Sequence, residues 1–174
     1  MVVTLRNLVP LALLALAAPA AAGAGILGGD APACANGEGP AVLATIVGLK
    51  DRKGELKLEL YPANNQDFLK DDRDLLKEGK LFRRIRVATP QVGPVAMCMR
   101  VPRPGRYALL FTHNRDGKNK FSIWADGAGF ASNQKLGRAR PQVDQALVDV
   151  PAGVTQVTIH AQYLRGLSGF APLS

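Results

Sequence analysis

The chain has 174 residues and a formal net charge of +8 at pH 7, with 22 Lys and Arg against 14 Asp and Glu. This length suits one domain with a proper core rather than two. Aromatic residues make up 6% of the chain and no nucleic-acid-binding module is recognisable, so the positive charge does not indicate a nucleic-acid partner.

Residues 1–22 have the pattern of a secretory signal peptide. One cation, Arg6, precedes an apolar run from Leu8 through Leu16, which is too short to span a bilayer. The small residues at 20–22 then offer an Ala-x-Ala cleavage site. We therefore expect a periplasmic or secreted protein with no transmembrane segment after processing. An uncleaved membrane anchor is the alternative.

The positive charge of an exported protein bears on its partners. Summed charge raises the local concentration of anionic envelope components, such as lipopolysaccharide or acidic polysaccharide. Attraction of this kind is not specificity. A net charge that only keeps the protein soluble is the alternative.

Two cysteines, Cys34 and Cys98, follow the predicted leader. Exported proteins meet an oxidising compartment in which paired thiols persist, so we expect a disulfide between them. Two free thiols are the alternative. A catalytic cysteine is not indicated, because neither residue lies in a Cys-x-x-Cys motif. The bond would fasten residues 23–40 to a central strand. Their Gly, Ala and Pro content predicts a flexible N-terminal segment.

The rest of the chain has the rhythm of an all-β domain, because short segments of strand composition alternate with turn residues. After the turn at 50–54, Leu56, Leu58 and Leu60 alternate with charged residues, which predicts leucines in the core and charges in water. Seven strands are predicted, at residues 42–49, 55–61, 81–89, 95–101, 106–113, 145–150 and 155–164. They predict a seven-stranded β-sandwich over residues 41–166, followed by a C-terminal tail at 167–174.

One short helix is predicted at residues 64–79, where apolar side chains recur at helical spacing. Asn64 or Asn65 can cap its start, and Gly79 marks its end. We expect its single apolar stripe to cover one end or edge of the sheets. A partner-binding helix is the alternative.

Five cations lie close together at the end of this helix and in the next strand. They are Lys77, Lys80, Arg83, Arg84 and Arg86. They form either an anion-binding patch or, as we expect, the charged face of an edge strand that resists aggregation. Arg83 shares a strand face with apolar residues, which a bulge or an edge position would explain.

Residues 102–134, PRPGRYALLFTHNRDGKNKFSIWADGAGFASNQ, carry a resemblance to a known family. Its elements are Pro104-Gly105-x-Tyr107-Ala108, His113 with an Asn/Asp/Gly/Lys loop, and Gly129-Phe130-x-Ser132-Asn133. On these residues the chain resembles the bacterial domain-of-unknown-function family numbered 2141, over about residues 42–164. The resemblance implies an exported protein with an immunoglobulin-like or transthyretin-like sandwich, and it supplies no activity.

Members of that family carry an acidic, Asn-rich loop after the His that looks like a cation site. The oxygen donors available here are Asn114, Asp116, Asn119, Ser122 and Asp126. Calcium requires about six to eight oxygens, with enough carboxylates to offset dehydration, and two carboxylates among lysines make a poor site. We therefore expect no cofactor or metal, with Ca²⁺ as the alternative. We expect a loop shaped by hydrogen bonds from side chains to backbone.

No catalytic set can be named from the sequence, so we expect a protein that is not an enzyme. His113 and His160 are the only histidines, zinc would need further nitrogen or sulfur ligands, and no serine lies in a Gly-x-Ser-x-Gly elbow. Trp124, with Phe121 and Phe130, forms either a platform for a sugar or peptide or a plug at the end of the sandwich.

We expect a non-enzymatic binding module of the bacterial envelope, for an envelope glycan or another envelope protein, because β scaffolds place function on their loops. The predicted ligand-binding residues lie at 113–133; they are His113, Asn114, Asp116, Asn119, Trp124, Asp126, Phe130 and Asn133. The alternative is a structural or accessory envelope protein without a small-molecule ligand. It would act through a strand edge or a basic patch at Lys80, Arg83, Arg84 and Arg86.

Overall fold

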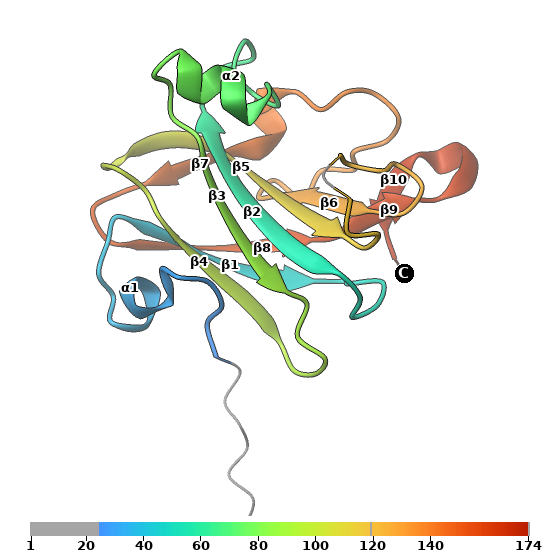
Figure 1. The fold of residues 1–174 in the computed structure, drawn as a ribbon, viewed down its shortest axis with the longest axis horizontal. Helices are drawn as coiled ribbons and strands as arrows, with labels where there is room; N and C mark the ends of the chain where they lie inside the picture. Colours follow the sequence, from blue (N-terminus) through green and yellow to red (C-terminus); the bar gives the residue numbers. More distant parts are fainter. Residues whose placement is uncertain (1–24, 119, 174) are drawn as a thin grey trace, which may run out of the picture.

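The structure is a computed structural model that describes residues 25–118 and 120–173, so the predicted signal peptide at 1–22 lies outside the described residues. Strands dominate the fold (Figure 1). The strands are β1 (Ala41–Val47), β2 (Glu55–Pro62), β3 (Arg83–Ala88), β4 (Val95–Arg100), β5 (Gly105–Asn114), β6 (Gly127–Phe130), β7 (Leu147–Val150), β8 (Val154–His160), β9 (Gln162–Leu164) and β10 (Phe170–Pro172). The short helices are α1 (Ala31–Ala35), α2 (Asp72–Lys77) and the 3₁₀ turns η1 (Val143–Ala146) and η2 (Gly166–Ser168). Within the described residues no helix is both long and apolar enough to cross a membrane.

The strands form two sheets, which confirms the predicted all-β class. The small sheet has the order β4-β1-β8, and the large sheet has the order β10-β9-β6-β5-β2-β3, with β7 also paired to β5. Strand β1 runs parallel to β8 and antiparallel to β4. The described residues thus hold ten strands where seven were predicted.

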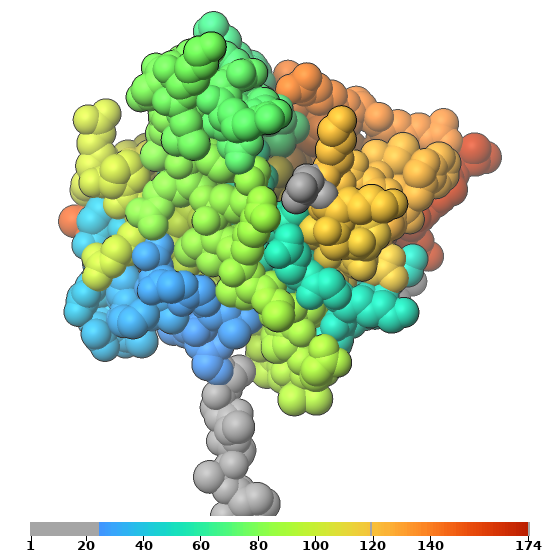
Figure 2. All heavy atoms as spheres, viewed as in Figure 1, coloured from blue at the N-terminus to red at the C-terminus, as the bar shows by residue number. Residues whose placement is uncertain are grey.

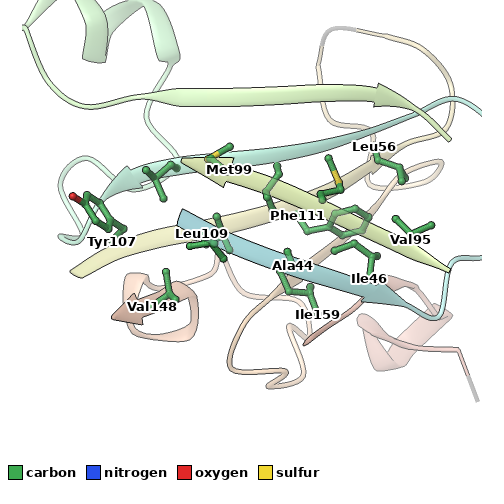
Figure 3. Packing of buried hydrophobic residues seen from close by; sticks show 14 of the residues in the cluster. Ala44, Ile46, Leu56, Val95, Met99, Tyr107, Leu109, Phe111, Val148 and Ile159 are labelled. Carbon is green, nitrogen blue, oxygen red and sulfur yellow. The ribbon is translucent and has the colours of Figure 1, made fainter. Parts of the chain in front are cut away.

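The main hydrophobic core lies between the two sheets. Leu56, Leu58 and Leu60 of β2 are fully buried there, as their alternation predicts. Figure 3 shows Phe111 of β5 among side chains of the small sheet such as Ile46. Full burial of one such side chain contributes about 1.5–3 kcal/mol to folding.

The outer face of the large sheet is also covered, which corrects the prediction that the charges of β2 lie in water. Lys57 is only 7% exposed and Glu59 only 6%. A second hydrophobic cluster on this face joins Tyr61 of β2 and Phe130 of β6 to residues of the α2 region and η1. Strand alternation shows which side chains share a face, but only the tertiary fold decides whether that face meets water.

The N-terminal segment is packed against the small sheet, which differs from the flexible lead-in that its composition predicts. Leu27 donates from its backbone nitrogen to Ala96 and accepts from Cys98, so it extends the edge of β4. The predicted disulfide between Cys34 of α1 and Cys98 of β4 is confirmed. Both half-cystines are buried in a third small hydrophobic cluster.

The predicted helix at 64–79 is shorter in the structure. Leu69 has a positive φ of 59°, a left-handed conformation that no α-helix can pass through. Asn64 therefore caps a separate turn by accepting from the Asp67 amide, and Asp71 caps α2 by accepting from the Arg73 amide. Helix α2 lies over one end of the large sheet, and Gly79 follows its last turn as predicted (Figure 1).

Two strands of the large sheet were not predicted, and one predicted strand is divided. Strand β6 was missed because two of its four residues are glycine, which strands disfavour. The predicted strand 155–164 breaks at Ala161 into β8 and β9, which belong to different sheets. The predicted C-terminal tail instead forms η2 and β10. In β10, Phe170 pairs with Leu164 and also bonds to Gly137.

Candidate binding site

The outer face of the large sheet contains a cavity of about 370 Å³. In Figure 2 this face is turned toward the viewer, with the green α2 region and the yellow-orange residues that follow β5 standing at the surface. Lys57, Glu59, Tyr61, Leu69, Arg84, Leu110, Thr112, Asn114, Lys118, Lys120, Phe121, Asp126, Ala128, Phe130 and Pro141 line the cavity. Most of this lining comes from β2, β5, β6 and the loop that joins β5 to β6.

Strand register arranges the floor of the cavity in rows across three strands. Lys57, Thr112 and Ala128 form one row, because Thr112 pairs with both of the others. Glu59, Leu110 and Phe130 form the next row in the same way. Side chains directly opposite one another in antiparallel strands lie close together. A polar row therefore borders a partly apolar one, all on the face away from the main core.

A charged network occupies the deeper part of the cavity. The Glu59 carboxylate accepts from the Arg84 guanidinium and from the Tyr61 hydroxyl, the latter at 3.0 Å. Arg84 also donates to Asp72 at 2.8 Å and lies over the Phe82 ring, 4.8 Å from its centroid. Burial, and then the neighbouring Glu59 carboxylate, raise the pKa of Tyr61, which therefore stays a neutral donor. These groups satisfy one another and form a fixed wall.

Asn114, at the end of β5, contains a buried oxygen atom that lacks a hydrogen-bond partner among the described residues. Its side-chain nitrogen donates to Glu55 at 3.0 Å and to the Lys118 carbonyl at 3.1 Å, which fixes the orientation of the amide. Its Oδ1 then has no hydrogen-bond partner within the part of the chain that the structure describes, although the residue is only 2% exposed. An unpaired buried acceptor is costly, and Asn114 belongs to the lining, so a bound O–H or N–H group that reached this oxygen would be favourable.

The loop between β5 and β6, residues 115–126, forms one side of the cavity and is held by its own hydrogen bonds. Both carboxylate oxygens of Asp126 accept backbone N–H groups, from Arg115 and from Ser122, each at 2.8 Å. Arg115 donates to the Ala125 carbonyl at 2.6 Å and pairs with Asp51. The hydrogen bond from Arg115 lowers the pKa of Asp51 to about 2.

The cavity lies inside a region that one protein family shares. DUF2141, described as an uncharacterized protein conserved in bacteria, matches residues 44–158. The chain belongs to this family. All residues that line the cavity fall within the matched range. No curated protein and no solved structure matches the chain.

The predicted ligand-binding residues of this DUF2141 domain are divided by the structure. Three of them, Asn114, Asp126 and Phe130, come together in the lining of the cavity. Trp124 is 80% exposed and does not line it. Asn133 bonds instead to the backbone of β8. Asn119 lies outside the described residues.

Two further predicted residues, His113 and Asp116, also lie elsewhere. His113 faces the interior between the sheets. Its Nε2–H donates to the Lys53 carbonyl at 2.8 Å, and its Nδ1 accepts from the Tyr163 hydroxyl at 2.7 Å. Asp116 accepts from the backbone of Lys118 at 3.0 Å and pairs with its ammonium group. Among the described residues, no three His, Cys, Asp or Glu side chains are grouped as metal ligands would be.

The predicted basic patch is largely compensated by acidic neighbours. Lys80 pairs with Asp67 at 2.6 Å, and Arg83 pairs with Asp30 at 3.0 Å. Arg84 belongs to the cavity network already described. Arg86 makes no ion pair within residues 25–118 and 120–173. Strand β3 is an edge of the large sheet, which confirms the edge position inferred from Arg83.

Sequence reasoning missed most of the cavity, including Lys57, Glu59 and Thr112. One pattern in the sequence points to it. Residues 107–111 of β5 form a continuous apolar run, Tyr-Ala-Leu-Leu-Phe, which is typical of a strand buried on both faces. A sheet buried on both faces needs a second covering layer, and the polar side chains of neighbouring strands are then enclosed beneath it.

Proposed function

We propose that this DUF2141 protein is a non-enzymatic binding module of the bacterial envelope, and that its cavity holds a small hydroxylated ligand such as a sugar unit of an envelope glycan. The unpaired Oδ1 of buried Asn114 is the observation that carries the proposal. The cavity volume of about 370 Å³ falls within the range of pockets that hold small molecules.

The mixture of groups in the lining suits a sugar better than a purely ionic ligand. Sugar hydroxyls both donate and accept, so one ring can donate to Asn114 Oδ1 and accept from the hydroxyl of Thr112. Phe121 and Phe130 provide apolar surface for the C–H groups of a ring. Glu59 and Arg84 already neutralise each other, so they supply no net charge that selects an ion.

A non-enzymatic role is supported by the chemistry of the lining. The described lining contains no His, Cys or Ser, the residues that most often act as base or nucleophile. Its two buried carboxylates are both held by other groups. Glu59 accepts from Arg84 and from the neutral Tyr61 hydroxyl, and Asp126 accepts two backbone N–H groups.

A location outside the cytoplasm is part of the same proposal. The predicted leader and the Cys34–Cys98 disulfide both suit an oxidising compartment. Sugars of the envelope are hydroxylated ligands that such a protein would meet there. The net positive charge would bring the protein toward anionic glycans, and the cavity would select the sugar.

Calorimetry with methyl glycosides of glucose, galactose and N-acetylglucosamine tests the proposal on the purified protein. We expect at least one to bind, and Thr112→Val to weaken that binding by about tenfold, because the variant keeps the shape but loses a hydroxyl. Ala128→Leu adds bulk to the lining and should abolish binding. Leu76→Ser, an exposed position outside the cavity, is the matched control. Binding that survives Ala128→Leu unchanged, or no binding by any of the three, would contradict the proposal.

A further inference from the structure

A second cavity of about 400 Å³ adjoins the first on the same face of the large sheet. Phe121, Ala128 and Pro141 line both cavities, so the two meet beneath the loop at 115–126. The second cavity continues toward β9 and β10, where Leu164 and Phe170 contribute to its lining.

The wall of the second cavity is held in place by Gln162, a fully buried residue of β9. Its Oε1 accepts from the Leu136 amide at 3.0 Å, and its Nε2 donates to the Gln134 carbonyl at 2.7 Å. Gly137 and Phe170 also exchange two backbone hydrogen bonds, at 2.7 and 3.0 Å. These bonds fix the segment at 134–137 to the sheet, and the residues that follow it, 138–141, complete the wall.

The chemistry of the second cavity differs from that of the first. Its lining is apolar except for Arg138 and Arg140, whose long side chains also offer aliphatic stems. Phe121 and Ile123 line it while remaining 46% and 50% exposed. Large apolar side chains that stay exposed at the mouth of a cavity are typical of a site that an apolar group covers.

We propose that the ligand of this protein is an amphiphile, with its hydroxylated head in the first cavity and an alkyl or acyl chain in the second. The inference rests on the proposed function for the position of the head, and it adds the class of molecule. The polar groups of the first cavity and the apolar lining of the second meet at Phe121 and Ala128, as one ligand with a polar and an apolar end requires.

Methyl β-D-glucoside and octyl β-D-glucoside test this inference, because they share a head and differ only in the chain. Each methylene transferred from water to an apolar site raises affinity by roughly fourfold. We therefore expect the octyl compound, kept below its critical micelle concentration, to bind at least about a hundredfold more tightly than the methyl compound in calorimetry.

A matched pair of variants tests where the alkyl chain of the ligand binds. Ile123→Asp places a charge in the lining of the second cavity and should reduce octyl glucoside affinity by about tenfold or more, while methyl glucoside affinity stays unchanged. Val92→Asp makes the same kind of change at an exposed valine outside both cavities, and it should alter neither affinity.

The outcomes separate this inference from the proposed function. Equal affinities for the two glucosides, both weakened by Thr112→Val, would overturn the amphiphile and leave the sugar site standing. Octyl glucoside binding that appears only above the micelle concentration, or that Val92→Asp reduces as much as Ile123→Asp, would also overturn it. If neither glucoside binds, the amphiphile inference fails for a glucoside head, and the proposed function then stands or falls with the other two methyl glycosides.

Discussion

His113 is a buried histidine whose two ring nitrogens both have partners. Nε2–H donates to the Lys53 carbonyl, and Nδ1 accepts from the hydroxyl of Tyr163. Burial lowers its pKa from the ordinary value near 6.5, against a smaller opposing effect of the Asp51 carboxylate, whose Oδ1 lies 4.0 Å from Nε2. The folded protein therefore holds a neutral imidazole at a pH where the unfolded chain begins to take up a proton.

This difference predicts a loss of stability as the pH falls below about 6.5. The stabilising effect of His113 is complete above the pKa of the unfolded chain, and it is lost as pH falls toward the lower pKa of the folded state. We expect a slope of at most about 1.4 kcal/mol per pH unit in urea unfolding between about pH 6.5 and 5. His113→Gln should flatten this slope, and His160→Gln should retain it. Equal slopes in the wild type and His113→Gln would exclude His113 as its source.

Gly127 of β6 shows why a small residue is needed at one position of the sheet. A Cβ atom there would lie 2.3 Å from Cε1 of the Tyr163 ring. The ring cannot easily retreat, because its hydroxyl is bonded to His113 and to the Lys50 amide. The missing side chain thus makes room for the tyrosine that fixes the buried histidine.

Gly127→Ala should therefore destabilise the protein by about 1–3 kcal/mol, the usual cost of overpacking a core. The matched control is Gly29→Ala, where no atom lies within 4 Å of the added Cβ and the backbone has an ordinary φ. Midpoints and slopes of urea unfolding measure both. A Gly127→Ala protein as stable as the control would mean that the Tyr163 ring can move aside without loss of packing.

Among the elements, strand alternation predicts where a strand such as β2 runs, and it fails where the sequence carries no alternation. Strand β2 matched because its inner leucines and outer charges alternate. Strand β6 did not, because its glycines serve close packing and carry no alternation. The helix predicted at 64–79 is too long, because Leu69 takes a left-handed conformation that apolar spacing does not reveal.

The candidate site could be predicted only in part for the same reason. Asn114, Asp126 and Phe130 follow from the unusual composition of the loop and its flanks. Lys57 and Glu59 resemble the solvent face of an ordinary hairpin, and only the covering layer formed by distant segments encloses them. A cavity on a sheet face depends on contacts between elements far apart in sequence, which local patterns do not contain.

The carboxylate of Asp126 holds two backbone amides of the loop at 115–126. Asp126→Asn removes one of the two oxygen acceptors and sets an NH₂ group against a backbone N–H, at a cost of about 1–3 kcal/mol. We expect faster hydrogen exchange at the amides of Arg115 and Ser122. Asp116→Asn, in the same loop, keeps an oxygen for its backbone bond with Lys118 and should leave those amides protected. Unchanged exchange in Asp126→Asn would show that the loop is held from elsewhere.

In the molecule as a whole, the large sheet uses its two faces for different tasks. Its inner face meets the small sheet across the main core, and its outer face supports the two cavities beneath the 115–126 loop and residues 136–141. The covering layer can therefore vary without disturbing the contact between the sheets. A binding site built on such a layer is separate from most of the packing that stabilises the domain.

Removal of the disulfide tests whether the binding site is independent of the packing that stabilises the domain. Cys34 and Cys98 join α1 to β4, packed against the small sheet and absent from the lining of either cavity. A cross-link across 64 residues of sequence contributes roughly 4 kcal/mol, mainly by restricting the unfolded chain. The double variant Cys34→Ala/Cys98→Ala should lose about that much stability in urea unfolding, as should the reduced wild type. Glycoside affinity of the folded fraction should stay within about twofold of the wild type, because the outer layer is fixed by its own hydrogen bonds. A parallel fall in affinity would mean that the small sheet and the outer layer are coupled through the large sheet, and the site would then depend on the whole sandwich.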